Sequence, residues 1–367
     1  MILMNDFKAE PAEMREAQLE AARRVLESGW YVLGSECQAF EQLWAQACGT
    51  SHCVGVGNGM DAIELALRGL GIGPGDEVIT TPMTAFATVL AILRAGAVPV
   101  LADIDPASAL LDPESVKRCL TARTRAVVLV HLYGQVRGMG TWQALCAQAG
   151  VALIEDCAQA HLASLGGRSA GSFGKAGAWS FYPTKNLGAV GDGGALVCSD
   201  DELAARVARL RNYGQSERYY HPELGMNSRL DELQAAMLAV RLEWLPGFTQ
   251  TRRQIAQAYR QGLRNPAVEL LAAPEEADSH VYHLFVVRCA ARDRLQAHLK
   301  EAGVQTLVHY PVPVHHQEPC RDLRRDPQGL SQAEQHGQVC LSLPCHPQLS
   351  ASQVEQVISA VNAFRLG

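Results

Sequence analysis

The chain has no excess of positive charge, and this argues against a nucleic-acid partner. Its 367 residues carry a formal net charge of −6, and no lysine- and arginine-rich run stands out. Proteins that bind nucleic acids usually present a basic face to the phosphates. Long apolar runs are also missing, since no stretch approaches the roughly 18 residues that suggest a membrane span. We therefore expect neither nucleic acid nor membrane as a partner.

The N-terminal segment and the cysteines also lack familiar patterns. The first residues, MILMNDFKAEPAEMREAQLE, contain no basic segment followed by an apolar core, so they do not resemble a secretory signal. The 11 cysteines are odd in number and include no CxxC pair, which disfavours a disulfide framework or a zinc ribbon. Two local clusters lack the paired spacing of a metal site: Cys340, Cys345 and His346, and His309, His315 and His316. We expect reduced thiols, a cytoplasmic location and no metal.

What the sequence does contain, up to about residue 245, is an alternation of helices and short apolar strands. Amphipathic helices are predicted over 12–28 and 35–48, and a glycine-led helix over 57–70. The predicted strands are 77–81, 98–105, 126–134, 151–159, GAWSF (177–181) and GGALV (193–197). Because these strands are rich in Val, Ile, Leu and Ala without polar alternation, they predict a largely parallel sheet buried on both faces. The fold class is therefore α/β.

The candidate domain junction is Pro246-Gly247. A helix near 230–244 is expected to end there, and a second to begin at Thr249. The segments that follow suit a smaller α/β domain: a strand around 281–288, a helix around 292–302, a Pro/His-rich segment 309–319 and a terminal helix 352–364. We predict a large domain of residues 1–247 and a small C-terminal domain of residues 248–367.

Three polar features fall near strand ends, where open α/β sheets bind ligands. The glycine loop 55–60 leads into a helix and is either a plain turn or a phosphate cradle. Glu155-Asp156 ends a strand, as an ion pair or cap, or as a partner for a metal, a ribose hydroxyl or a protonated ring nitrogen. Lys185 precedes LGAVGDGG and is a surface lysine, a phosphate ligand or a Schiff-base lysine. Together the three form the set that a pyridoxal phosphate site requires.

A nicotinamide-dependent sugar oxidoreductase is the competing class of enzyme. It would use the glycine loop at 55–59, but that loop does not satisfy GxGxxG. Asp76 and Glu77 lie near the expected distance for a ribose-binding acid, yet they precede a strand and do not end one. We therefore disfavour this class.

Several collinear motifs resemble the DegT/DnrJ/EryC1/StrS family of sugar aminotransferases over nearly the whole chain. They include SGWYVLG (28–34), VGNGMDAIELAL (56–67), IEDCAQAH (154–161), SFYPTKNLGAVGDGG (180–194) and GMNSRLDELQAA (225–236). The resemblance implies the type I aspartate-aminotransferase fold, with a mostly parallel mixed sheet flanked by helices. It also implies pyridoxal phosphate as cofactor and a homodimer with shared active sites.

The resemblance further implies a role for each matched residue. Lys185 would form the Schiff base with the cofactor and then act as the base that moves a proton between carbons. Asp156 would pair with the pyridinium nitrogen and keep it protonated. The remaining contacts implied are Gln159 with the ring hydroxyl, the amides of Gly59 and Met60 and the hydroxyl of Ser180 with the phosphate, and Asn227 with the phosphate of the neighbouring subunit.

Lys185 also bears on the reaction, because some family members carry histidine there and are dehydratases. Lysine predicts transamination, with L-glutamate as donor and a nucleotide-linked keto-deoxysugar as acceptor. The GNG loop and SGWYVLG favour carbon 3, as in a dTDP-3-keto-6-deoxyhexose. A 4-keto sugar, a UDP-3-keto sugar and a non-catalytic regulator that binds pyridoxal phosphate remain alternatives. Candidate residues to line the sugar-nucleotide site are Tyr220, His309, Tyr310, His315 and His316, and Arg211 and Arg229 are candidate partners for its diphosphate. A structural role is the alternative for each.

The sequence departs from the family pattern at one cofactor contact. After Thr84 the family usually has an aromatic residue that stacks on the cofactor ring, whereas this chain has Ala85. Either Phe86 takes over that contact through a backbone shift, or another group covers that face of the ring.

Overall fold

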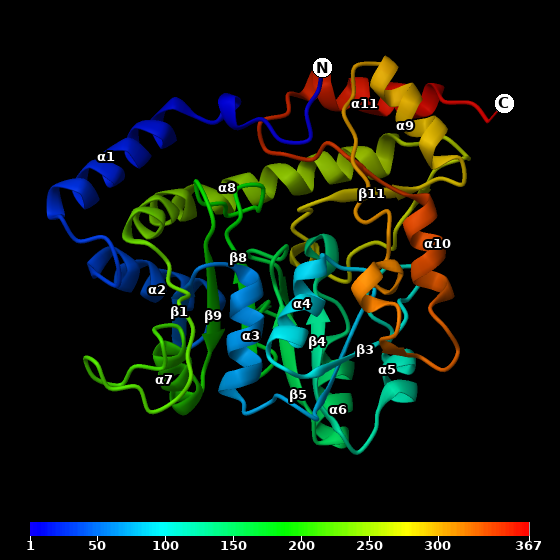
Figure 1. Cartoon of the computed structure of the whole chain (residues 1–367). Helices are drawn as coiled ribbons and strands as arrows, with labels where there is room; N and C mark the ends of the chain where they lie inside the picture. Colours follow the sequence, from blue (N-terminus) through cyan, green and yellow to red (C-terminus); the bar gives the residue numbers. More distant parts are fainter. Residues whose placement is uncertain (367) are drawn as a thin grey trace.

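An eight-stranded sheet forms the centre of the molecule (Figure 1), which we describe for residues 1–366 from a computed structural model. The strand order is β1-β9-β8-β5-β4-β2-β3-β12, and β9 runs against both of its neighbours while the remaining pairs are parallel. The strands are β1 (His52–Val56), β2 (Glu77–Thr80), β3 (Val98–Leu101), β4 (Thr124–Val130), β5 (Ala152–Asp156), β8 (Ala176–Ser180), β9 (Gly194–Cys198) and β12 (Arg324–Arg325). The predicted mostly parallel α/β sheet is confirmed. Sequence reasoning missed β1, the edge strand that leads into the glycine loop.

Helices cover both faces of this sheet, which explains why its strands lack polar alternation. In β4, Ala126 and Val128 face one apolar cluster while Val127 and Leu129 face another, as expected where successive side chains point to opposite faces. The first cluster contains residues of α3 (Gly59–Gly69), α4 (Phe86–Arg94) and α7 (Asp201–Leu210). The second contains residues of α2 (Ser35–Cys48), α5 (Pro113–Cys119), α6 (Met139–Ala149) and α8 (Glu232–Gly262).

A third apolar cluster lies in the C-terminal part of the chain. It contains residues of α9 (Arg292–Glu301), α11 (Ala351–Ala363) and two strands of an antiparallel sheet of order β10-β11-β13. These strands are β10 (Glu269–Leu270), β11 (Phe285–Arg288) and β13 (Cys340–Leu343), and α10 (Ser331–Val339) precedes β13. The shorter elements of the chain are η1 (Phe7–Ala9), η2 (Leu132–Gly134), β6 (Ser164–Leu165), β7 (Arg168–Ser169), η3 (Ala277–Ser279), η4 (Val314–His316) and η5 (Glu318–Cys320).

The helix expected to end at Pro246-Gly247 does not end there. α8 runs unbroken from Glu232 to Gly262, with Pro246 inside it, and α1 (Ala12–Ser28) packs against its first half. Its Leu245 belongs to the sheet cluster and its Tyr259 to the C-terminal cluster, so this one helix spans both (Figure 1). Apolar packing on both halves explains why the helix persists although proline removes one backbone hydrogen bond. The division into residues 1–247 and 248–367 stays a prediction.

The cysteines lie in the apolar interior. All 11 are free and buried among the described residues. In most of them burial raises the pKa of the thiol, to about 12 for Cys345 for example, so the thiolate form is disfavoured. No helix within residues 1–366 combines the length and apolarity that crossing a bilayer requires.

The continuity of α8 can be tested at Gly247. No atom lies within 4 Å of where a Cβ at Gly247 would stand, so alanine fits there. Because glycine in a helix interior costs about 0.5–1 kcal/mol relative to alanine, we expect Gly247→Ala to raise the free energy of unfolding by that amount. Urea denaturation measures it, and destabilisation would argue for a break at this position. The control is Gly214→Ala, which should destabilise because φ is +67° and the added Cβ would lie 1.9 Å from the carbonyl oxygen of Glu223.

Candidate active site

Three of the predicted site segments meet at the carboxyl edge of the sheet. Asp156 is the last residue of β5 and Ser180 the last residue of the neighbouring parallel strand β8. Gly59 begins α3 directly beside Ser180, since a Cβ on Gly59 would lie 2.7 Å from the Cβ of Ser180. Lys185 follows β8 by five residues and its amide donates to the carbonyl of Tyr182 at 2.8 Å. The fold therefore brings together residues that are up to about 125 positions apart in the chain.

The amine of Lys185 lies in surroundings that disfavour its charge. Burial lowers the pKa of Lys185, and the nearby carboxylate of Asp156 opposes that shift in part. A lowered pKa increases the fraction of neutral amine, which is the form that acts as nucleophile and base. The amine of Lys185 is therefore better suited to react with a carbonyl group than the amine of a solvent-exposed, ion-paired lysine would be.

Asp156 is held in one orientation by hydroxyl and amide donors. Its Oδ2 accepts from the hydroxyl of Thr88 at 2.8 Å, and its Oδ1 from the amide of Ala158 at 3.1 Å. The Thr88 hydroxyl in turn lies 2.8 Å from the hydroxyl of Thr84, which precedes α4 by two residues. The sequence analysis named Thr84 only as the residue before Ala85 and gave Thr88 no role. No local pattern indicated it, because Thr84 lies before the N-cap of α4 and Asp156 lies 68 positions from Thr88.

The N-terminus of α3 offers unpaired donors at the same edge. Asn58 caps the helix by accepting from the amide of Asp61 at 2.9 Å, whereas the amides of Gly59 and Met60 make no hydrogen bond to any described residue. Glycine is required nearby, because a Cβ at Gly194 would lie 2.3 Å from the backbone carbon of Asn58. Free amides at the positive end of a helix form a site for an anion.

Gln159, His309 and Tyr310 lie near Lys185 and Asp156. Gln159 accepts from the amide of Tyr133 at 2.6 Å and donates to the Tyr310 hydroxyl at 3.4 Å. Burial, then the charge of Asp156, raises the pKa of Tyr310 to about 12. Burial and the charge of Lys185 lower the pKa of His309 to about 4, so its imidazole is neutral at physiological pH.

His161, the last residue of the IEDCAQAH motif, has a supporting role in the structure. Its Nε2 donates to the carbonyl oxygen of Ser180 at 3.0 Å, and its ring packs against Trp44 and Trp179. Burial lowers its pKa to about 3, so the ring is neutral. His161 therefore supports the end of β8 from the side of the apolar core.

The other predicted substrate and cofactor residues make no hydrogen bond to Lys185, Asp156 or Gln159 within the described chain. His315 is buried and pairs with Glu334 at 2.9 Å, and Arg211 bonds to Glu41 and to the carbonyl oxygen of Gly55. Arg229 bonds to Asn212 at 3.1 Å. His316 lies 3.4 Å from Glu334, and Tyr220 and Asn227 are exposed. Their roles stay predictions.

The residues after Thr84 bear on the predicted stacking on the cofactor ring. Ala85 precedes α4 as its N-cap. Phe86 packs against the apolar cluster of Val89, Leu101 and Val314. The contacts of Phe86 therefore belong to the interior, and they do not favour the backbone shift that would make it a stacking residue.

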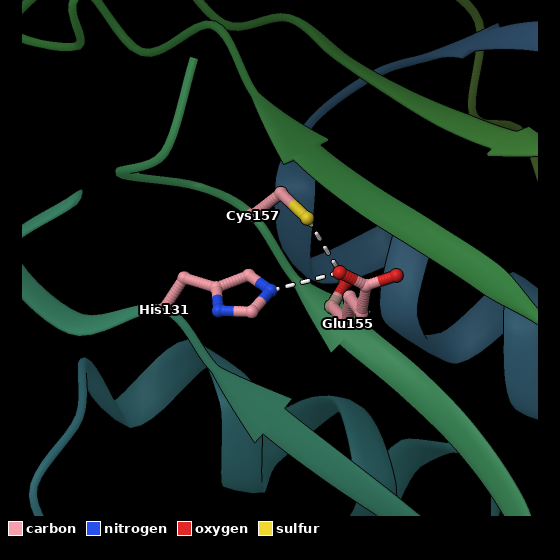
Figure 2. Close-up of side chains that lie close together, drawn as sticks. All are labelled: His131, Glu155 and Cys157. Carbon is pink, nitrogen blue, oxygen red and sulfur yellow. Dashed lines mark hydrogen bonds and ion pairs between the residues drawn. The ribbon is translucent and has the colours of Figure 1, made fainter. Parts of the chain in front are cut away.

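Glu155, the neighbour of Asp156, organises a separate buried cluster with His131 and Cys157 (Figure 2). Its carboxylate lies 2.8 Å from Nε2 of His131, and it accepts from the amides of Gly171, Phe173 and Gly174 at 2.7–2.9 Å. Cys157 makes only a weak contact, 3.7 Å from the carbonyl oxygen of Glu155. Because both carboxylate oxygens are used by these donors, we interpret the cluster as a fastening of the 171–174 loop and not as a metal centre.

This interpretation predicts the effect of Glu155→Gln. The amide group would put N–H donors against N–H donors, so we expect a loss of about 1–3 kcal/mol in the free energy of unfolding, measured by urea denaturation. Cys157→Ala is the control and should cost less, because its thiol is a weak donor here. Stabilisation of the wild-type protein by zinc that is lost in both variants would instead indicate a metal centre.

Comparison with known proteins identifies the family to which the chain belongs. Residues 12–362 match the DegT/DnrJ/EryC1/StrS aminotransferase family. The chain is 46% identical to the erythromycin biosynthesis sensory transduction protein EryC1 of Saccharopolyspora erythraea, over 98% of both chains. It is also 46% identical to dTDP-3-amino-3,4,6-trideoxy-alpha-D-glucose transaminase of Streptomyces venezuelae, over 98% of this chain and 95% of that one. A crystal structure of S. venezuelae DesV is 44% identical, with a TM-score of 0.96 over 100% of this chain and 99% of that chain. The chain therefore belongs to the DegT/DnrJ/EryC1/StrS aminotransferase family.

Proposed function

We propose that this aminotransferase moves an amino group from L-glutamate to the keto group of a nucleotide-linked deoxysugar. A dTDP-3-keto-6-deoxyhexose, aminated at carbon 3, is the favoured acceptor. The observation that carries the proposal is the amine of Lys185, whose pKa is lowered by burial next to the buried carboxylate of Asp156. The acceptor is supported by the likeness to the S. venezuelae transaminase.

The donor set of the site fits pyridoxal phosphate. The free amides of Gly59 and Met60, with the hydroxyl of Ser180, would hold the phosphate at the N-terminus of α3. Asp156 would hold the ring nitrogen, and Gln159 the ring hydroxyl. When bound, the cofactor supplies an electron sink that stabilises negative charge on the reacting carbon of the substrate.

The protein's own groups have separate tasks in this proposal. Lys185, as a neutral amine, takes the proton from the donor and later returns one to the acceptor carbon. Thr88 and the amide of Ala158 keep Asp156 oriented, so that its negative charge favours a protonated ring nitrogen. Tyr310 and the neutral His309, both half-buried, would limit the access of water to the amine.

We further infer that the active unit is a homodimer in which Asn227 reaches the phosphate bound by the partner. Asn227 is exposed, and Trp30, Tyr31 and Tyr182 are large apolar side chains with exposed fractions of 63%, 53% and 53%. A second copy would cover such surface. Tyr220 and Arg229 would then face the sugar nucleotide in the partner's site. The 11 free cysteines suit a cytoplasmic location.

Cofactor binding and the donor half-reaction test the proposal directly. Purified protein supplied with pyridoxal phosphate should be yellow, and borohydride should then link the cofactor covalently to Lys185, as peptide mass spectrometry can show. Lys185→Ala should not become linked, and its amino transfer should fall by several orders of magnitude because both nucleophile and base are lost. Lys175→Ala, on the loop before β8, is the matched lysine control. A protein that takes up no pyridoxal phosphate would overturn the proposal.

The acceptor is identified by a panel of keto-sugar nucleotides offered with ¹⁵N-labelled glutamate. NMR of the product should locate the new amine at carbon 3 of a dTDP-linked sugar. Amination at carbon 4, or of a UDP-linked sugar only, would replace this acceptor with one of the alternatives. A yellow protein that glutamate does not convert would instead favour a regulatory role, which the name of the S. erythraea relative also suggests for that protein.

A further inference from the structure

Arg252 is a buried arginine that has no acidic partner. It lies in the second half of α8 and is only 6% exposed. Its Nη1 donates to the backbone carbonyl oxygens of Tyr282 and Cys345. No carboxylate of residues 1–366 lies within ion-pair distance of it, whereas the neighbouring Arg253 pairs with Asp278 at 2.5 Å. A buried cation without a counter-ion is costly and therefore unusual.

The other guanidinium nitrogens of Arg252 are free to bind a ligand. Its Nε and Nη2 make no hydrogen bond to any described residue. Neither nitrogen is fully enclosed, so both remain accessible to a ligand. Burial lowers the pKa of Arg252 only to about 10, so it carries its charge at neutral pH. The free edge of the guanidinium thus presents positive charge and two donors.

Arg252 lines the same pocket as Lys185. This narrow pocket also includes Asn186, Phe248, His346 and two acidic residues, Asp6 and Glu10, of which Glu10 is already paired with Arg241. The charges of both Lys185 and Arg252 lower the pKa of His161 and of His283, so both cations act on the same side chains. An anionic group bound at Arg252 would therefore lie beside the reacting amine.

We propose that Arg252 binds a carboxylate of the amino donor; this assignment rests on the proposed aminotransferase function. A guanidinium matches a carboxylate with paired N–H donors, and the negative charge would supply the counter-ion that the chain lacks. L-glutamate carries carboxylates, whereas the sugar part of the acceptor is neutral. The diphosphate of the acceptor is a second anion, and its binding at Arg252 is an outcome that the experiment distinguishes.

The assignment predicts an effect confined to one half of the reaction. Arg252 should contribute when glutamate binds and when 2-oxoglutarate leaves, because both carry the carboxylates. It should contribute little when the keto-sugar nucleotide reacts with the aminated enzyme. A residue that only supported the fold would impair both halves alike.

The test uses glutarate, a dicarboxylate without the amino group, which binds but cannot be transaminated. Isothermal titration of the cofactor-loaded protein should give a Kd roughly 10- to 100-fold weaker for Arg252→Gln than for the wild type. Arg252→Lys keeps the charge and a donor for the carbonyls, and should recover part of the affinity. The rate of the glutamate half-reaction, at subsaturating glutamate, should fall in the same order.

Arg253→Gln is the matched control. Arg253 also ties backbone carbonyls, those of Asp278 and His280, but its charge is already paired. This variant should bind glutarate as the wild type does, and thermal melting of all three variants checks their folding. If Arg252→Gln does not fold, the weaker binding is read from Arg252→Lys.

The proposal is overturned if the wild type does not bind glutarate, or if both Arg252 variants bind it as tightly as the wild type. It is also overturned if the loss falls on the keto-sugar half-reaction, which would assign Arg252 to the diphosphate. Failure of the aminotransferase function looks different: wild-type protein that glutamate does not convert, whatever its affinity for glutarate.

Discussion

The two carboxylates at the end of β5 point to opposite faces of the sheet, and the rest of the site depends on this alternation. Glu155 lies on the face of Leu153 and Cys157, where it holds the 171–174 loop and contacts His131. Asp156 lies on the face of Ile154, beside α4, where Thr88 orients it. One pair of adjacent acids thus serves the scaffold on one side and the reactive edge on the other. A shift of one residue in the register of β5 would exchange the two.

The surroundings of Lys185 follow from this arrangement. The amine lies near Asp156 at the sheet edge and near His309 of the C-terminal segment, in surroundings where burial disfavours its charge. Asp156 opposes the loss of charge on the lysine, but burial has the larger effect. Burial therefore lowers the pKa of Lys185 on balance and raises its fraction of neutral amine, the form that takes up a proton in amino transfer.

Sequence patterns predicted those parts of the molecule that local chemistry determines. The apolar strands, the helices over 12–28 and 35–48, and the glycine loop before α3 are where the sequence placed them within a few residues. The break at Pro246-Gly247 was wrong, because apolar packing on two clusters outweighs the local cost of proline and glycine. The orientation of Asp156 by Thr88 could not be predicted, because it depends on a contact between residues 68 positions apart. Arg252 escaped notice because nothing in a helical RR pair indicates which arginine is buried.

The burial of the thiols has a practical consequence. The 11 cysteines are spread over several of the apolar clusters, including those on both faces of the sheet and the C-terminal one around α9 and α11. A thiol reagent can reach each of them only when its surroundings open, because the enclosed, protonated sulfur does not react. Each cysteine therefore reports when the apolar cluster around it opens. The order in which the cysteines become labelled would rank the local stability of the clusters.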